Sequence, residues 1–299
     1  MSAKPEGTPM RARVIACTIV VASLAFLAGI VFERWVGTDA AIDWAGLRHQ
    51  LVLHQTRSTA DRVAVSLPAA APARTMVALV FGQSNAGNSG ETRGPSYRNV
   101  LEYYRGRFYE ARDPLLGATG DGGSIWMRVA AKAIASGAYD TVVLVPFAVG
   151  TADIARFAPG GSLHGGLLRV IADAQRSGLV FTHLLWEQGE ADAYAKTSPD
   201  AYRQRFEAMV GAIRGLGVNA PVYVARATRC AKVRPSDELG NAQAALVDAA
   251  SGILAGPNLD TLGFAERYDG CHFSTEGLDR AADLWLEALE APVPPALSR

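Results

Sequence analysis

The sequence has little cysteine and no surplus of either charge. Its three cysteines form no Cys-x-x-Cys pair, so the spacing that is typical of a structural zinc site is missing and we expect no metal. Lysine plus arginine and aspartate plus glutamate each number 29, and no basic stripe is interleaved with aromatic residues. Nucleic-acid-binding proteins carry such a stripe, so we expect no nucleic-acid partner.

Charged residues are missing altogether from one long stretch near the N-terminus. Residues 14–32 contain no charge, and their number is close to the roughly 20 residues that cross a bilayer. This stretch is longer than the apolar region of about 7–15 residues in a cleaved signal peptide. Arg11 and Arg13 lie on its short N-terminal side, which the positive-inside rule places in the cytoplasm. We therefore expect an uncleaved, single-pass transmembrane signal anchor; a buried core helix is the alternative.

This topology predicts where the rest of the chain lies. Residues 1–13 are expected in the cytoplasm, and everything after the anchor is expected in the periplasm or outside the cell, attached to the inner membrane. Residues 33–75 predict a juxtamembrane stalk that ends in the Pro- and Ala-rich linker SLPAAAPART. The folded domain is expected over 76–291, followed by a tail at 292–299.

Short apolar runs alternate with longer helical patterns through the predicted domain. The runs are rich in β-branched or aromatic residues and short enough to be buried strands: 76–81, 141–147, 182–187, 221–227 and a weaker one at 259–264. The helical patterns lie at 123–137, 162–177, 198–214, 235–255 and 276–290. This alternation predicts an α/β fold, a three-layer α/β/α sandwich with a central parallel sheet of about five strands.

Polar residues follow these strands, and in parallel α/β sheets the sites form at the carboxyl ends of the strands. Ser84 follows the first strand within GQSN and has glycines at 82 and 87, which permit a tight turn. A serine hydroxyl needs a base to become a nucleophile. His272 follows the predicted fifth strand with Asp269 three residues before it. These three residues predict a Ser-His-Asp triad.

Such a triad requires donors for the developing oxyanion. The candidates are the backbone N–H groups of Ser84 and Gly150 and the side-chain amide of Gln188. The segment FGQSNAG lacks the G-x-S-x-G pattern of the nucleophile elbow, so an α/β-hydrolase elbow is not indicated.

Four blocks in this order resemble the SGNH hydrolases, and most closely the branch of sialate O-acetylesterases and plant-type carbohydrate acetylesterases. They are GQSN at 82–85, VPFAVGTADI at 145–154, WEQGEADA at 186–193 and DGCH at 269–272. The resemblance spans roughly 76–290 and implies a flavodoxin-like sandwich and serine esterase chemistry.

The resemblance also implies roles for single residues. Ser84 is then the nucleophile, His272 the base and Asp269 its acidic partner, while Gly150 and Gln188 complete the oxyanion hole.

Two more residues are expected to support this site, Asn85 and Glu190. The chain departs from the family at Val149-Gly150-Thr151, where paired glycines commonly precede the threonine, and at Ala86, where methionine is frequent. The first departure bears on the assignment of Gly150 as an oxyanion donor, and alanine at 86 is expected to alter the floor of the substrate pocket.

Cys230 and Cys271 both follow predicted strands, and the predicted topology places them in an oxidising compartment. We expect a disulfide between them that holds the loop of Asp269 and His272. Two unpaired buried cysteines are the alternative.

The predicted function is a membrane-anchored serine esterase that removes O-acetyl groups from a carbohydrate through an acetyl-enzyme, without a cofactor. The alternatives are an acetyltransferase that uses the same triad on a polysaccharide, and a noncatalytic carbohydrate-binding module. Zero net charge gives no preference for an anionic substrate, although four arginines near strand ends can bind a carboxylate: Arg93, Arg98, Arg156 and Arg229.

Overall fold

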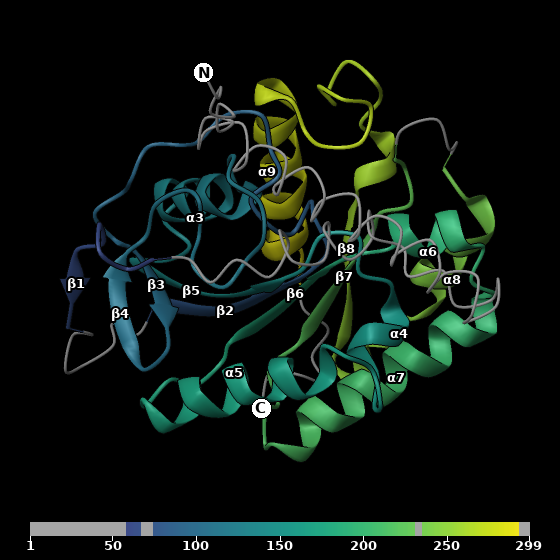
Figure 1. Cartoon of the computed structure of the whole chain (residues 1–299), viewed down its shortest axis with the longest axis horizontal. Coiled ribbons are helices and arrows are strands. Elements are labelled where there is room, and N and C mark those ends of the chain that lie inside the picture. Colours follow the sequence, from purple (N-terminus) through teal and green to yellow (C-terminus); the bar gives the residue numbers. More distant parts are fainter. Residues whose placement is uncertain (1–57, 67–73, 231–234, 293–299) are drawn as a thin grey trace, which may run out of the picture. The chain divides into compact units, whose positions relative to one another are not determined.

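The structure is a computed structural model that describes residues 58–66, 74–230 and 235–292, all within one compact unit (Figure 1). The predicted anchor at 14–32 lies outside these residues, as do the predicted cytoplasmic segment and most of the stalk. No helix in the described part of the chain is long and apolar enough to cross a membrane.

The centre of this unit is an eight-stranded mixed sheet with the order β1-β4-β3-β5-β2-β6-β7-β8. Six neighbouring strands, from β3 to β8, run parallel, whereas β4 is antiparallel to β3 and β1 is antiparallel to β4. The strands are β1 Ala64–Val65, β2 Thr75–Gly82, β3 Val100–Tyr104, β4 Arg107–Glu110, β5 Thr141–Ala148, β6 His183–Glu187, β7 Val222–Arg226 and β8 Ile253–Asn258.

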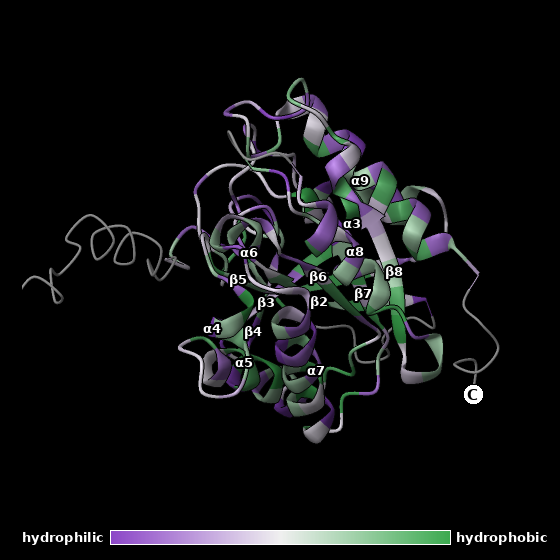
Figure 2. Ribbon diagram, turned by 90° about the vertical axis from the view of Figure 1, so that its right-hand side faces the viewer, coloured by the Kyte–Doolittle hydropathy of each residue, from purple (hydrophilic) through white to green (hydrophobic). Residues whose placement is uncertain are grey.

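Helices cover both faces of the sheet, which confirms the three-layer architecture (Figure 1). Helices α3 and α9 pack on one face, and α4, α5, α7 and α8 pack on the other. The helices are α3 Ile125–Ala135, α4 Ile154–Phe157, α5 His164–Arg176, α6 Glu190–Ala195, α7 Pro199–Gly215, α8 Asp237–Ala245 and α9 Thr275–Glu290. Their outer faces carry hydrophilic residues, while the central strands are hydrophobic (Figure 2).

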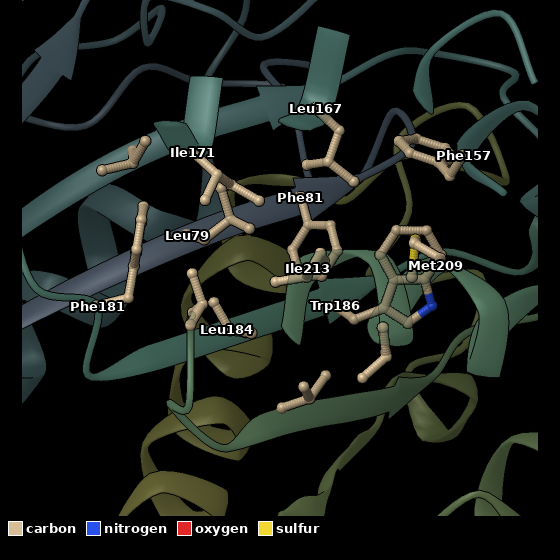
Figure 3. Close-up of a cluster of buried hydrophobic side chains, with 14 of the residues drawn as sticks. Leu79, Phe81, Phe157, Leu167, Ile171, Phe181, Leu184, Trp186, Met209 and Ile213 are labelled. Carbon is tan, nitrogen blue, oxygen red and sulfur yellow. The ribbon is translucent and has the colours of Figure 1, made fainter. Parts of the chain in front are cut away.

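The central strand β2 shows why the sequence forms a sandwich. Alternate residues of a strand point to opposite faces, and β2 is apolar on both. Leu79 and Phe81 belong to the hydrophobic cluster under α5 and α7, where Phe81 lies 4.8 Å from Trp186 between ring centroids (Figure 3). Ala78 and Val80 belong to the cluster under α3 and α9. Strand β2 is thus buried on both faces, and this packing holds its carboxyl end in place.

Four of the five predicted strands are confirmed, and the fifth was placed wrongly. Leu259–Thr261 is a short 3₁₀ helix, and the actual strand, β8 at Ile253–Asn258, begins in the last residues of the stretch that was predicted as a long helix at 235–255 and ends just before the predicted strand. Strand β8 contains Gly256 and Pro257, which disfavour a strand interior but are tolerated at a sheet edge. A side chain at Gly256 would lie 2.8 Å from the backbone of β7.

The sheet is also larger than expected, because the chain before β2 and the β3–β4 hairpin add to it. Strand β1 lies within the predicted stalk at 33–75, so the domain begins earlier than residue 76. Arg62 donates a 2.9 Å hydrogen bond to Glu102, and both side chains are almost fully buried. Burial raises the pKa of Glu102 to about 7 in spite of this arginine.

Candidate active site

Ser84 lies directly after β2, at the carboxyl end of the sheet. The turn begins at Gly82, whose φ of 143° favours glycine and whose added side chain would lie 1.8 Å from the carbonyl oxygen of Glu187 on β6. The side chain of Gln83 then accepts hydrogen bonds from the N–H groups of Gly189 (3.3 Å) and Ala191 (3.1 Å). Gln83 therefore ties the Ser84 turn to the segment that follows β6.

His272 and Asp269 form the pair that the sequence predicts. Nδ1 of His272 lies 2.6 Å from one carboxylate oxygen of Asp269. The other oxygen accepts the backbone N–H groups of Cys271 (2.8 Å) and His272 (2.7 Å). Partial burial raises the pKa of Asp269, but the hydrogen bonds from His272 and Cys271 outweigh it, so the pKa lies below its usual value. Asp269 stays ionised and orients the imidazole ring.

Ser84 and His272 line one pocket of about 710 Å³, called here the Ser84 pocket. Thr151, Tyr194 and the sulfur-bearing residues Cys230 and Cys271 form further parts of its wall. Within the described residues no hydrogen bond joins Ser84 to His272. Contacts between catalytic groups often tighten only once a substrate is bound, so this geometry agrees with a nucleophile and base that meet at a substrate.

The two predicted oxyanion donors other than Ser84 do not line this pocket. The N–H of Gly150 donates to Oγ1 of Thr119 at 2.8 Å. The amide nitrogen of Gln188 has three internal acceptors, of which the nearest is Asp192 at 2.6 Å, and its side chain is fully buried. The structure therefore places Gly150 and Gln188 in the supporting network.

Thr151 does line the pocket, and sequence reasoning missed it. Its φ of 60° is left-handed, an unusual and strained conformation for a β-branched residue. Among the hydrogen bonds of the described residues, none is donated by the N–H of Thr151 or of Ser84. The signal for Thr151 was present in the sequence, because it is the threonine that follows Gly150 in the second block, where the family commonly has paired glycines before the threonine.

Asn85 and Glu190 connect the two halves of the site. The amide of Asn85 donates to Oε1 of Glu190 at 2.7 Å and to the carbonyl oxygen of Cys271 at 3.3 Å. Glu190 is buried, and burial raises its pKa although the Asn85 hydrogen bond acts in the opposite direction. These contacts link the turn of Ser84 to the loop of His272, as a supporting role requires.

Two further buried charged residues lie beside this link and were not predicted. Glu187 is fully buried, and neither carboxylate oxygen has a hydrogen-bond partner. Burial, and next the charge of Glu190, raise its pKa well above the usual range. The guanidinium of Arg267 donates hydrogen bonds to the backbone carbonyl oxygens of Leu259, Leu262 and Cys271. Burial therefore disfavours the charged form of both Glu187 and Glu190, and Arg267 holds the His272 loop in place through its hydrogen bond to Cys271.

The predicted disulfide is confirmed, because Cys230 and Cys271 are bonded. Cys271 directly precedes His272, so the bond fastens the base to the segment after β7. Across residues 58–66, 74–230 and 235–292, no three His, Cys, Asp or Glu side chains gather as a metal site would require.

The α/β sheet, with a serine, a histidine and an aspartate at its carboxyl edge, has the architecture and the site of a hydrolase of carboxylic esters. A family model described as "SASA: Carbohydrate esterase, sialic acid-specific acetylesterase" matches residues 74–289. The match covers more than half of the chain, and the chain belongs to this family of esterases that act on acetylated carbohydrates.

Solved structures agree on the fold. An Arabidopsis thaliana protein has a TM-score of 0.62 and 17% identity, and the match covers 75% of this chain and 100% of that one. A putative GDSL-like lipase from Parabacteroides merdae has a TM-score of 0.50 and 13% identity, over 71% of this chain and 94% of that one. A search of curated proteins finds no match.

Proposed function

We propose that the chain removes O-acetyl groups from a carbohydrate by way of an acetyl-enzyme on Ser84. The observation that carries this proposal is the placement of His272, which is hydrogen-bonded to Asp269 and lines the same pocket as a serine just after the end of a buried strand. A noncatalytic binding module has no need of an oriented base beside a nucleophile.

The chemistry takes two steps. Oγ of Ser84 attacks the acetyl carbonyl carbon while Nε2 of His272 takes the hydroxyl proton, and Asp269 stabilises the imidazolium that forms. The tetrahedral intermediate collapses, and the sugar hydroxyl leaves with the proton from His272. Water then attacks the acetyl-enzyme with His272 again as base, and it releases acetate and free Ser84.

The developing oxyanion requires donors that are not already engaged. We assign this role to the backbone N–H groups of Ser84 and Thr151, because both residues line the pocket and neither N–H donates elsewhere in the described structure. Gly150 and Gln188 hold the two flanking segments in place through Thr119 and Asp192. The assigned donors thus differ from the predicted set in two ways, because Thr151 replaces Gly150 and the internally bonded Gln188 is no longer a donor.

Exposed aromatic side chains support a sugar as the substrate. Tyr194 lines the pocket and is 78% exposed, and Tyr268 is 51% exposed with its ring centroid 6.3 Å from that of His272. Aromatic rings that are kept at a pocket mouth in contact with water offer large rigid surfaces to the apolar face of a sugar ring. An acetylated pyranose between Tyr194 and Tyr268 presents its ester to Ser84.

The membrane topology remains part of the proposal. The uncharged stretch at 14–32 supports an anchor, and the disulfide near His272 suits an oxidising compartment such as the periplasm. Protease digestion of intact spheroplasts tests this, since a chain with its domain outside the inner membrane is degraded without lysis. Protection until lysis would contradict the topology.

The activity is tested with the purified full-length chain and 4-nitrophenyl acetate. We expect Ser84→Ala and His272→Ala each to lower kcat by about 10³-fold or more, because a triad acts as a unit. Ser251→Ala and His164→Ala, which are outside the Ser84 pocket, serve as matched controls and should retain activity. Equal rates for Ser84→Ala and the wild type would refute the mechanism, and acetate release without an added sugar acceptor distinguishes hydrolysis from transfer.

A further inference from the structure

A second pocket lies on the other side of the loop that contains Gly150. It has a volume of about 480 Å³ and is called here the α5 groove, because one face of α5 forms a wall and the β3–β4 turn forms another. A smaller pocket of about 260 Å³ continues it along α5. No residue lines both this groove and the Ser84 pocket. The volume lies in the range of about 300–1,000 Å³ that is common for small-molecule sites.

The groove combines aromatic surface with positive charge. Tyr104 and Phe147 contribute rings, and a side chain at Gly166 would lie 3.1 Å from the Phe147 ring, so the absence of a side chain at 166 keeps this ring uncovered. Arg105 and Arg169 line the same groove. Aromatic faces and guanidinium groups together match a ligand that has both an apolar ring face and an anionic group.

Both arginines are available to a ligand. In the described part of the chain neither Arg105 nor Arg169 pairs with a carboxylate, whereas the one acidic residue of the groove, Asp173, is paired with Arg176. Arg169 lies against Gly165, with Nη1 3.3 Å from the position of an added Cβ. None of the four arginines singled out in the sequence lines this groove. The positive charge of the groove is therefore not neutralised from within.

Arg105 occupies a position where arginine is costly. It is the first residue of the two-residue turn between β3 and β4, with φ of 49°, and Gly106 follows with φ of 81°. Turns with two positive φ values favour Asn-Gly, and a left-handed residue other than glycine costs about 1 kcal/mol. The guanidinium lies 5.2 Å from the centroid of the Tyr104 ring, on the groove. A strained position that holds a charged side chain against a pocket points to a function.

The groove is close enough to the Ser84 pocket for one glycan to reach both. Val149 lines the groove and Thr151 lines the Ser84 pocket. Two residues of chain span at most about 7 Å, so these two wall residues are separated by about the length of one sugar unit. Thr119, which also lines the groove, accepts the N–H of Gly150 between them.

We propose that the α5 groove binds a carboxylate-bearing sugar unit of the same glycan whose acetyl group enters the Ser84 pocket. The carboxylate pairs with Arg105 and Arg169, and the ring packs on Tyr104 and Phe147. This inference rests on the proposed esterase function and narrows its substrate class to acidic, acetylated polysaccharides. A glycan that is bound at both sites presents its acetyl ester to Ser84 in a fixed register.

The proposal is tested by titrating the purified full-length chain with trigalacturonate, and with cellotriose as a neutral probe, in calorimetry at low and high salt. We expect trigalacturonate to bind more tightly than cellotriose, and salt to weaken its binding. Arg105→Asn with Arg169→Gln should raise the Kd by about tenfold or more, as expected for lost hydrogen bonds to a charged group. Asn suits the left-handed turn, so the Tm of this variant should not fall.

Arg107→Gln is the control, because Arg107 follows the same turn but does not line the groove, and its replacement also removes a positive charge, one where the double variant removes two. Its Kd should equal that of the wild type. Equal binding of both trisaccharides, or equal Kd values for the wild type and the double variant, would overturn the proposal. If the wild type hydrolyses 4-nitrophenyl acetate but does not bind trigalacturonate, the groove inference alone is wrong. Binding without hydrolysis would instead refute the esterase proposal.

Discussion

The two sides of the active site are held in different ways. The sheet side, which presents Ser84, follows a strand buried on both faces, and its turn is fixed by hydrogen bonds that the Gln83 side chain accepts from the N–H groups of Gly189 and Ala191. The loop side, residues 267–274, belongs to no helix or named strand. One disulfide, the guanidinium of Arg267 and the hydrogen bonds of Asp269 hold it. The nucleophile is thus positioned by the core of the fold, and the base is positioned by a few cross-links.

The largest effect that sharpens this comparison is expected from Asp269→Asn. An amide at this position can still accept the N–H groups of Cys271 and His272, but its NH₂ group faces Nδ1 of His272 and favours the wrong tautomer. We expect kcat to fall by about 10²–10⁴-fold with the fold intact. Stopped assays with 4-nitrophenyl acetate and far-UV circular dichroism measure both. A fall of less than twofold would show that Asp269 does not orient the base.

Opening the disulfide should harm the loop side and leave the sheet side unchanged. A misplacement of about 1 Å at a catalytic group can cost about 10²-fold in rate, so we expect a loss of this order after reduction. The matched control is Cys230→Ala, which cannot form the disulfide. Its kcat should already be as low as that of the reduced wild type, and the reductant should not change it. Full activity in a sample whose thiols titrate as free would mean that the loop needs no cross-link.

Glu190 lies where the two sides meet, and its replacement should have a smaller effect. Glu190→Ala leaves the buried amide of Asn85 without its 2.7 Å partner, which costs about 1–3 kcal/mol of unfolding free energy. Glu190→Gln keeps an acceptor oxygen and should retain most of the stability and kcat. Urea unfolding and steady-state kinetics compare the two variants. Equal losses of stability and kcat in both would argue against a positioning hydrogen bond.

The last effect concerns pH, and the two sides should respond in opposite directions. The pKa of Glu187 on the sheet side is raised, so its stabilising contribution is complete below the unfolded value of about 4.5 and is lost as pH rises toward the folded pKa. The lowered pKa of Asp269 makes a contribution that is present above about 3.8 and is lost as pH falls through its folded value.

Glu187→Gln removes the pH dependence of stability that comes from Glu187. The Tm of Glu187→Gln should rise relative to that of the wild type as the pH increases from about 5 to about 8. Each unit by which the pKa of Glu187 is raised within this range corresponds to about 1.4 kcal/mol of unfolding free energy. Glu207→Gln is the control, because Glu207 is exposed on α7. A constant Tm difference across this pH range would show that Glu187 is already ionised in the folded chain.

The same contrast explains what the sequence could reveal. The residues to which we assign the chemistry, Ser84, Asp269 and His272, were predicted because they follow strands or stand at a recognisable spacing, and the structure brings His272 to Asp269 and to the pocket of Ser84. The pairing of Cys230 with Cys271 followed from the same reasoning. Chemistry confined to short motifs can be predicted from one chain.

Features that depend on distant contacts were not found. Strand β8 pairs with its neighbour β7 despite Gly256 and Pro257, and the β3–β4 turn has Arg105 before Gly106 where Asn is usual. Gln188 could have faced the pocket by sequence alone, but its acceptors come from elements far along the chain. The left-handed conformation of Thr151 is likewise unusual for a β-branched residue, so its residue type did not indicate it.

The most direct test of the account is to trap the acetyl-enzyme. The full-length chain is mixed with 4-nitrophenyl acetate, quenched in acid within one turnover and digested, and its peptides are analysed by mass spectrometry. The account predicts one acetyl group on Ser84 in the wild type and none at this peptide in Ser84→Ala. Steady hydrolysis with no acetyl group on Ser84, or with the acetyl group on another residue, would contradict it.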